Sequence, residues 1–519
     1  MNRWLGLGLL LALAGAVALR GPGLDLRPVH NDEAINAAKL QTLWEKGSYV
    51  YNPHEFHGPT LYYCALPFVW LSPARNFDEL NAATLRSATV FFGAALIVLL
   101  ALMADGLGKP ATAVAAVLTA ISPAMVFYSR YFIHEMLLVF FTSLVIAAGW
   151  RWFQTRRIGW ALLGGAGVGL MYATKETFVI SLGVMSAAAI LTYALGRWRG
   201  QPIPNRRAVG EFKHILAGLA VAAIIAIVLF TSIFTNPRGL LDSVLAYVPW
   251  LSRAGGGSPH IHPWYFYFER LAFFHRDGGP VWSEGLIVIL AAVGAVAALT
   301  GRGLGRASAS LVRFLAFYTA ILTLAYSMIP YKTPWCLLSF WCGMILLAGV
   351  GTVALLRLVP RLWWRLGLGV ILAAAATQLA WQAWALNYKY SADRGNPYVY
   401  AQTSPKMLEL VERVEALAKV DPQGHDMIVQ VMAPGNDYWP LPWYLRTFKH
   451  VGWWDMIPDD PYAPVMMVSP SFSAALDEKS GKGWLMVGLY ELRPGVFFEL
   501  YVESGLWRKY VDMLPKGEH

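Results

Sequence analysis

Long apolar segments alternate with short polar ones along the first three quarters of the chain. Each apolar segment is bounded by charged residues, Gly or Pro, and each approaches the roughly 20 residues that a helix needs to cross a hydrocarbon core. The pattern predicts a polytopic all-α membrane protein with about eleven spans. They cover residues 4–20, 84–104, 111–128, 134–150, 158–174, 177–195, 214–234, 284–300, 312–329, 335–356 and 366–386.

The first apolar run has some features of a secretory signal peptide. Arg3 precedes an apolar stretch from Trp4 to Leu19, but no A-x-A cleavage site follows before Arg20. We therefore expect an uncleaved first membrane helix.

Segment 21–83 is a long loop with a pattern of its own. After a polar opening, apolar residues recur in it at helical spacing, at Ala34, Ile35, Ala38, Leu43 and Trp44. This pattern predicts an amphipathic interfacial helix that ends at Gly47.

The tail changes character after about residue 395. A helical stretch over 406–419 is followed by β-like runs at 427–432, 465–468, 484–490 and 496–502. We predict two domains: a transmembrane module over residues 1–390 and a small external α/β domain over residues 395–519.

Composition agrees with a membrane protein. The 519 residues are 56% hydrophobic and 14% charged, whereas globular domains carry about 25% charged residues. The net charge of +10 is not a sign of nucleic-acid binding, because the basic residues cluster between the apolar segments. The three cysteines are too few for a disulfide framework, and we expect free thiols.

The basic residues also predict orientation. With a cytoplasmic N-terminus, alternate loops that are rich in Lys and Arg fall on the cytoplasmic side of an inner (plasma) membrane. These loops carry Lys109; Arg151, Arg156 and Arg157; Arg197, Arg199, Arg206, Arg207 and Lys213; Arg302, Arg306 and Arg313; and Arg357, Arg361 and Arg365. Segments 21–83 and 235–283 then lie outside the cytoplasm, and an odd number of spans places the tail there too.

The first candidate site follows the first span. Asp32 and Glu33 stand next to His30, and the later stretch YVYNPHEFHGPTLYY adds His54, Glu55 and His57. A carboxylate in a site that excludes water can act as a general base toward a hydroxyl. The alternative is structural: Asn31 or Asp32 suits a helix N-cap, and Glu33 suits the first turn.

Three later loops, on the same predicted side, each hold one cation. YSRYFIHEM contains Arg130, His134 and Glu135; YATKETF contains Lys175 and Glu176, and a pair between these two is one interpretation; SMIPYKTPWC contains Tyr331 and Lys332. Cations are disfavoured outside, so their recurrence there is explained by recognition of an anionic phosphate. The alternative is that each cation only extends to the lipid headgroups.

The loop with Gly255, Gly256 and Gly257 is followed by His260, His262, Trp264, Tyr265 and Tyr267. It is a candidate gate or sugar-binding loop, while its His spacing is a weak zinc signature.

Together these motifs resemble the GT-C superfamily of lipid-phosphate-sugar-dependent glycosyltransferases, in its protein O-mannosyltransferase-like and aminoarabinose-transferase-like branch. HNDEA, HGPTLYY, YSRYFIHE, ATKE, PYKTPW and DYWPLPWYLR look most like the bacterial and archaeal flippase-activity-associated subfamily. The resemblance implies a GT-C fold, with interfacial helices in the first external loop and the external α/β domain.

The resemblance also implies roles for single residues. Asp32 is the expected catalytic base, with Glu33 and Glu135 in support. The expected phosphate-binding cations are Arg130, Lys175 and Lys332. The other expected substrate-binding residues are His57, His134 and Tyr331. No cofactor is expected, although Asp32, Glu135 and a histidine are an alternative divalent metal site.

The predicted function is inverting transfer of a sugar from a polyprenyl-phosphate donor to a hydroxyl on a lipid, glycan or protein acceptor outside the cytoplasm. One alternative is a transporter or flippase-associated protein, in which the same charges line a headgroup path. Visible repeats and mid-span charges would favour a transporter, and the sequence shows neither. A third interpretation is a silent scaffold that binds an assembly partner.

Overall fold

The computed structural model describes residues 3–54, 57–200, 208–255, 260–276 and 278–514. Contacts divide the chain into two compact units. The first, called here the helical unit, comprises Met1–Leu24, Thr42–Ser72 and Ala83–Val399. The second, the sheet unit, comprises Asp25–Gln41, Pro73–Ala82 and Tyr400–His519. Two pieces of the first long loop therefore join the tail, which the sequence pattern did not indicate.

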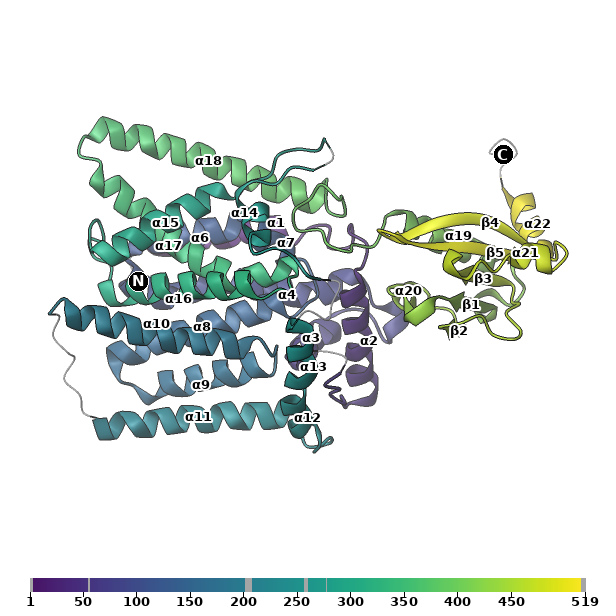
Figure 1. Cartoon of the computed structure of the whole chain (residues 1–519), viewed down its shortest axis with the longest axis horizontal. Helices are drawn as coiled ribbons and strands as arrows, with labels where there is room; N and C mark the ends of the chain where they lie inside the picture. The colour runs from purple at the N-terminus through teal and green to yellow at the C-terminus, as the bar shows by residue number, and fades with distance from the viewer. Residues whose placement is uncertain (1–2, 55–56, 201–207, 256–259, 277, 515–519) are drawn as a thin grey trace. The chain divides into compact units, whose positions relative to one another are not determined.

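The helical unit is a bundle of long apolar helices joined by short turns and short helices (Figure 1). In chain order the elements are α1 (Arg3–Arg20), α3 (Thr60–Leu71), α4 (Ala82–Leu99), η2 (Leu100–Met103), α5 (Ala104–Leu107), α6 (Lys109–Ile121), α7 (Pro123–Ser129), α8 (Glu135–Thr155), α9 (Ile158–Tyr172), α10 (Phe178–Trp198), α11 (Ala208–Phe230), α12 (Gly239–Leu245), α13 (Tyr247–Ala254), α14 (Phe266–Ala272), α15 (Gly285–Thr300), α16 (Ala309–Met328), η3 (Pro334–Leu337), α17 (Leu338–Leu358) and α18 (Leu362–Tyr388).

Every predicted span is helical, but the predicted number of crossings is not confirmed. Within the described part of the chain, 8 helices are long and apolar enough to cross a membrane, and 9 if α6 and α7 form one span bent by 58°. The remaining two predicted spans correspond to α9 and α15, of 15 and 16 residues. Both are shorter than the roughly 20 residues of a perpendicular crossing.

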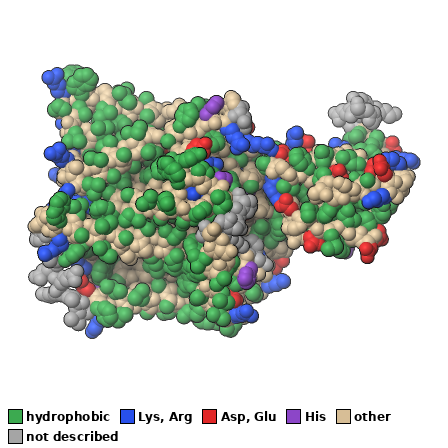
Figure 2. Space-filling view, in the orientation of Figure 1, with side chains coloured by type: hydrophobic (Ala, Val, Ile, Leu, Met, Phe, Trp, Pro, Cys, Tyr) green, Lys and Arg blue, Asp and Glu red, His purple; other side chains and the backbone are tan. Residues whose placement is uncertain are grey.

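Small residues allow the central helices to approach closely. A Cβ on Gly294 of α15 would lie 2.0 Å from the Leu347 carbonyl oxygen, and one on Gly351 of α17 would lie 1.9 Å from the Leu290 carbonyl oxygen. Such backbone contact provides van der Waals packing where lipid offers no hydrophobic driving force. At the periphery, α11 and α18 expose apolar side chains, and Figure 2 shows this green surface over the bundle.

The sheet unit contains a mixed five-stranded sheet in the order β2-β1-β3-β5-β4. Strands β1, β2 and β3 are parallel, whereas β5 is antiparallel to β3 and β4. Its elements are α2 (Asn31–Lys46, of which residues through Gln41 belong to this unit), η1 (Phe77–Glu79), α19 (Lys406–Val420), η4 (Gly424–Asp426), β1 (Ile428–Met432), η5 (Pro434–Asn436), α20 (Leu441–Tyr444), β2 (His450–Trp454), β3 (Val465–Val468), η6 (Pro470–Phe472), α21 (Leu476–Lys479), β4 (Trp484–Arg493), β5 (Val496–Glu503) and α22 (Ser504–Met513).

The local predictions for α2, for the tail helix and for four of the strands are confirmed. Helix α2 ends before Gly47, whose φ of +68° suits glycine. Strand β2 was missed because its sequence, HVGWW, contains a glycine and its edge position leaves no alternating burial. The three cysteines are free thiols, as predicted.

Candidate functional site

His30 and Glu33 together cap the N-terminus of α2. The backbone N–H of Asp32 donates to Nδ1 of His30 at 3.0 Å, and the backbone N–H of His30 donates to Oε2 of Glu33 at 3.0 Å. This reciprocal arrangement is a capping box in which His replaces the usual Ser or Thr. Since Nδ1 accepts, Nε2 carries the proton and donates to the Tyr400 carbonyl oxygen at 3.0 Å.

The cap uses one carboxylate of the acidic pair and leaves the other exposed. Glu33 is 1% exposed, whereas Asp32 is partly exposed. Among the described residues, no hydrogen bond or ion pair reaches the Asp32 carboxylate. Burial lowers the pKa of Arg493, and the negative charge of Asp32 partly offsets that effect. The structural interpretation therefore holds for Glu33, with His30 as the N-cap in place of Asn31 or Asp32.

The tail motif DYWPLPWYLR secures the segment that carries Asp32. The Tyr444 hydroxyl accepts from the Val29 N–H at 2.7 Å, and Arg446 donates to the Leu80 carbonyl oxygen at 2.6 Å. Thr403, just before α19, donates to the Val29 carbonyl oxygen at 2.7 Å. All these contacts lie within the sheet unit, so the acidic segment is fixed by residues about 400 positions later.

In the helical unit, Lys175 pairs with Glu135, and Glu176 pairs with His57. The Lys175 ammonium and the Glu135 carboxylate form a buried ion pair. His57 Nδ1 lies 2.7 Å from Glu176 Oε2, and the Tyr51 hydroxyl donates to Glu176 Oε1 at 3.3 Å. Lys175 and Glu176 therefore do not pair with each other, because the turn between α9 and α10 directs the two side chains to different partners.

The contacts with Glu135 and His57 determine the charge states of Lys175 and Glu176. Burial alone would lower the pKa of Lys175, but the Glu135 carboxylate raises it above its ordinary value. Burial alone would raise the pKa of Glu176, but His57 holds it below its ordinary value. Both groups are charged at neutral pH, and the positive charge of Lys175 is compensated locally.

Backbone contacts join three of the sequence motifs. The Gly58 N–H donates to the Thr174 carbonyl oxygen at 3.1 Å, and the Thr60 N–H donates to the Ala173 carbonyl oxygen at 3.0 Å. His134 Nε2 lies 3.0 Å from the Gly58 carbonyl oxygen. HGPTLYY, ATKE and YSRYFIHE therefore meet at one place in the helical unit.

Arg130 does not have the contacts of a phosphate ligand. Its NH1 donates to the carbonyl oxygens of Arg20 and Pro22 at 2.9 and 2.6 Å, and its NH2 donates to that of Gly23 at 2.7 Å. The guanidinium also lies over the Tyr388 ring, 4.6 Å from its centroid, and the residue is 5% exposed. Arg130 thus holds the chain where it leaves α1.

Lys332 lies in a group of positive charges. Its Nζ donates to the carbonyl oxygens of His262 and Ile329 at 3.0 and 2.5 Å. No carboxylate of the described residues pairs with it. Tyr331, beside it, forms a β-bridge with Ile261.

Arg270, which was not among the residues expected from the sequence, lies near the same group, and its guanidinium pairs with the Glu269 carboxylate at 3.6 Å. Burial lowers the pKa of His262 to about 4, and the positive charges of Arg270, His260 and Lys332 contribute to that shift. Arg270 lies over the Phe266 ring, 3.5 Å from its centroid. A cation within an aromatic stretch, YFYFERLAFF, was the signal that sequence reading could have used.

The alternative metal site does not fit these contacts. Within the described ranges, no three His, Cys, Asp or Glu side chains are grouped so that they could hold a metal ion. Glu135 is already paired with Lys175. Of the remaining candidates, Glu55, Arg206, Arg207, Gly256 and Gly257 lie outside the described residues.

Part of the chain matches a known protein family in sequence. The family model described as dolichyl-phosphate-mannose-protein mannosyltransferase matches residues 61–241. No curated protein matches the chain in sequence.

Solved structures match over most of the chain. ArnT from Cupriavidus metallidurans bound to undecaprenyl phosphate has a TM-score of 0.61 at 15% identity, covering 97% of this chain and 98% of that one. The oligosaccharyltransferase of Archaeoglobus fulgidus in its apo form has a TM-score of 0.59 at 14% identity, over 87% of this chain. This chain spans only 64% of that enzyme's length. AglB from the same organism, in complex with an inhibitory peptide and a dolichol-phosphate, gives 0.58 at 12% identity, with 98% and 77% coverage.

The chain has the fold of the GT-C glycosyltransferases: a bundle of membrane helices and a small C-terminal sheet domain. The mannosyltransferase family model matches residues 61–241, and ArnT overlaps the fold of this chain from end to end. The GT-C fold that the resemblance implied is confirmed.

Proposed function

We propose that this protein is a membrane glycosyltransferase that moves a sugar from a polyprenyl-phosphate-linked donor to an acceptor hydroxyl outside the cytoplasm. The observation that carries the proposal is the state of the acidic pair: His30 and Glu33 form a cap that holds Asp32, while the Asp32 carboxylate is left available. An available carboxylate on a fixed helix start is what a general base requires.

In the proposed reaction, the acceptor oxygen attacks the anomeric carbon and the bond from that carbon to the phosphate oxygen breaks. Asp32 takes the hydroxyl proton, and the lipid phosphate leaves with the bonding electron pair. A single displacement of this kind inverts the anomeric configuration. Glu33 acts as a positioning residue, because its carboxylate accepts from the His30 N–H and fixes the turn that presents Asp32.

We assign the departing phosphate to Lys332. Lys332 lies among like charges and is held by carbonyl oxygens, which orient its ammonium group without neutralising it. A fixed, uncompensated cation stabilises the negative charge that develops on a leaving phosphate. Lys175 and Arg130 are less suited, since one is neutralised by Glu135 and the other is occupied by carbonyl oxygens.

The neighbours support this substrate class. ArnT was solved with undecaprenyl phosphate and AglB with a dolichol-phosphate, so both bind polyprenyl phosphates. We propose residence in the inner (plasma) membrane with the basic loops in the cytoplasm, as the charge distribution favours. We propose a reaction without a cofactor or metal ion. Glu135, one of the possible metal ligands, forms an ion pair with Lys175 instead.

The test is donor turnover by the purified full-length protein in lipid nanodiscs. The probes are radiolabelled mannose, glucose and aminoarabinose, each linked to undecaprenyl phosphate, with a total membrane extract as the acceptor source. We expect sugar transfer and release of undecaprenyl phosphate with at least one donor. Asp32→Asn should lower the rate by about 10² to 10⁴, the usual contribution of a general base.

Glu33→Gln is the matched control, since it changes the adjacent carboxyl group in the same isosteric way. Because the Gln amide oxygen can still accept from the His30 N–H, this variant should lower the rate much less than Asp32→Asn does. An Asp32→Asn variant with the wild-type rate would show that the base is assigned wrongly.

A further inference from the structure

A groove lies in the helical unit, away from the residues assigned to transfer. It has a volume of about 720 Å³ and is bordered by α8, α10 and α16, which are labelled in Figure 1. Its walls are apolar, with Val145, Met185, Ala189 and Phe314 among them. Binding cavities for small molecules typically measure about 300–1,000 Å³, so the volume is large enough for part of a lipid.

One end of the groove is polar and basic. Arg197, at the end of α10, lines it together with Gln154 and Ser308. Arg199 is close enough to Arg313 for their charges to repel. Figure 2 shows Lys and Arg side chains along the left-hand edge of the bundle, where α10 ends.

These cations are not neutralised by nearby acids. Asp105 pairs with Arg151 at 2.7 Å, and Glu211 pairs with Arg156 at 3.3 Å. Across the described residues, no carboxylate forms an ion pair with Arg197 or Arg199. The basic end therefore has a charge that an anionic group can complement.

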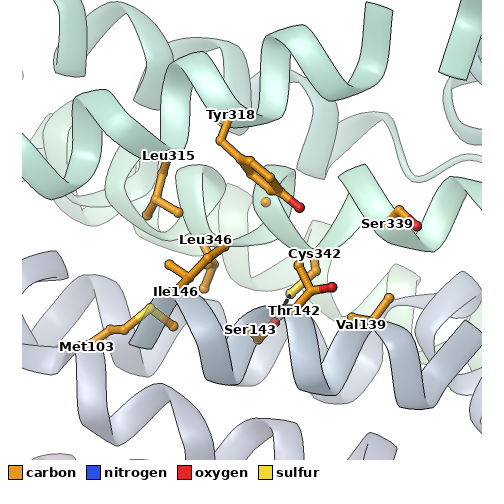
Figure 3. A pocket seen from close by; sticks show the side chains of 11 residues that line it. Met103, Val139, Thr142, Ser143, Ile146, Leu315, Tyr318, Ser339, Cys342 and Leu346 are labelled. Carbon is orange, nitrogen blue, oxygen red and sulfur yellow. Dashed lines mark hydrogen bonds between the residues drawn. The ribbon is translucent and has the colours of Figure 1, made fainter. Parts of the chain in front are cut away.

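The groove does not continue as a wide passage into the core. Ile146 lines it and also lines a cavity of only about 10 Å³ between α8, α16 and α17. Figure 3 shows that cavity closed in by Met103, Leu315 and Leu346, with Tyr318 and the hydrogen-bonded Ser143 and Cys342 beside it. A volume of this size holds about one water molecule. A ligand of the groove therefore does not extend into the core of the bundle.

The groove and the proposed phosphate site are at opposite ends of α16. Ser308 immediately precedes this helix of 20 residues, and Lys332 follows it by four positions. At a rise of 1.5 Å per residue, the two ends are about 30 Å apart, close to the thickness of a hydrocarbon core. One lipid phosphate cannot occupy both places.

We propose that the groove binds an anionic membrane phospholipid. Its headgroup phosphate lies at Arg197, and an acyl chain lies against the apolar walls formed by α8, α10 and α16. Basic recesses between membrane helices are suited to such headgroups, because arginine donates paired hydrogen bonds to phosphate. This site is independent of the proposed sugar transfer.

The test uses a glycine that faces the open groove. Gly149 of α8 lines it, and a Cβ at that position meets nothing within 4 Å. Gly149→Leu fills the groove without a backbone clash. Gly183→Leu in α10 is the matched control, since Gly183 is equally open but does not line the groove. Both changes favour helix formation, so neither should impair folding.

The full-length protein is purified in a mild detergent from membranes that contain phosphatidylglycerol, phosphatidylethanolamine and polyprenyl phosphate. The co-purified lipid is then quantified by mass spectrometry per mole of protein. We expect phosphatidylglycerol enriched over its share of the membrane in the wild type and in Gly183→Leu, and lost in Gly149→Leu. Arg197→Gln should reduce its retention about fivefold, the contribution of one cation near an anionic headgroup.

Equal phosphatidylglycerol content in Gly149→Leu and Gly183→Leu would overturn the site. Loss of lipid in Gly149→Leu with no effect of Arg197→Gln would overturn its anionic character. Polyprenyl phosphate in place of phosphatidylglycerol would overturn the proposed occupant. Size-exclusion profiles of the three variants identify any that misfolds, and Arg197, being exposed, gives a variant that does not depend on core packing.

Discussion

His30 shows how a single residue decides the role of its neighbours. As the N-cap of α2, the His30 ring accepts a hydrogen bond from the Asp32 N–H. In return, the Glu33 carboxylate accepts one from the backbone N–H of His30. Glu33 is thereby committed to structure, and Asp32 remains the carboxylate available for chemistry. In the proposed function, the adjacent acids of the sequence motif are therefore a base and the residue that positions it.

The first prediction concerns pH. Burial lowers the pKa of His30 below its ordinary value of 6.5, the net result after the opposing effects of Asp32 and Glu33. The neutral form is required because Nδ1 accepts a hydrogen bond. Its stabilising contribution is thus complete above pH 6.5 and is lost as the pH falls below that value toward the folded-state pKa.

We expect the melting temperature of the wild type to fall between pH 7 and pH 5. In His30→Asn, a residue that caps helices without titrating there, the fall should be smaller. Differential scanning fluorimetry of the full-length protein in detergent measures both. An equal decline in the two proteins would mean that His30 does not carry the pH dependence.

The second prediction concerns Arg130. Its charge-assisted hydrogen bonds to three carbonyl oxygens are buried, so Arg130→Gln should lower the free energy of unfolding by about 3 kcal/mol. Arg238→Gln is the control, because that arginine side chain is 77% exposed and its ion pair contributes under about 1 kcal/mol. Thermal melting compares the two. If Arg130→Gln melts like the wild type but loses donor affinity, the phosphate role implied by resemblance is the correct one.

At the scale of elements, periodicity predicted the helices well and their partners poorly. All the predicted spans are helical, because a long apolar run in a membrane has few other solutions. Helix α3 was not predicted as a separate element and was counted within the loop 21–83. Its twelve residues include Pro67 and are too few to span a bilayer.

The pairing of charges could not be predicted in the same way. Lys175 and Glu135 are 40 positions apart, and the Tyr444 hydroxyl meets the Val29 N–H across 415 positions. Such contacts depend on how distant segments approach one another, which local patterns do not encode. The sequence thus brought these residues into view, but not the carbonyl oxygens that Arg130 contacts or the pairing of Lys175 with Glu135.

The third prediction concerns the approach of two turns. A Cβ on Gly58 would lie 2.1 Å from the Ala173 carbonyl oxygen, a distance that real Cβ atoms do not show. Gly58→Ala should therefore separate the HGPT segment from the turn that holds Lys175 and Glu176. We expect a loss of roughly 1–3 kcal/mol in stability, together with reduced sugar transfer.

Gly159→Ala is the matched control, because Gly159 lies in helix α9 with nothing within 4 Å of an added Cβ. It should keep or slightly raise the melting temperature. Wild-type stability and transfer in Gly58→Ala would show that the close approach is not required.

At the scale of the whole molecule, the distribution of basic residues favours one orientation of the protein in the membrane. The basic loops gather at one end of the bundle, and Lys332 follows the opposite end of α16. Positive loops remain in the cytoplasm during insertion. If the proposed orientation is correct, the sheet unit is exposed outside the cytoplasm.

This orientation predicts the accessibility of single cysteines. In a background with Cys64, Cys336 and Cys342 changed to Ser, Lys482→Cys places a thiol on the exposed turn before β4. Arg302→Cys places one in the exposed basic loop between α15 and α16. A membrane-impermeant maleimide applied to intact spheroplasts should label the Lys482→Cys protein at once. It should label the Arg302→Cys protein only after the membrane is permeabilised, since a charged reagent does not cross the hydrocarbon core. The reverse pattern would place the sheet unit, and Asp32 with it, in the cytoplasm, where an extracytoplasmic acceptor would never reach the proposed base.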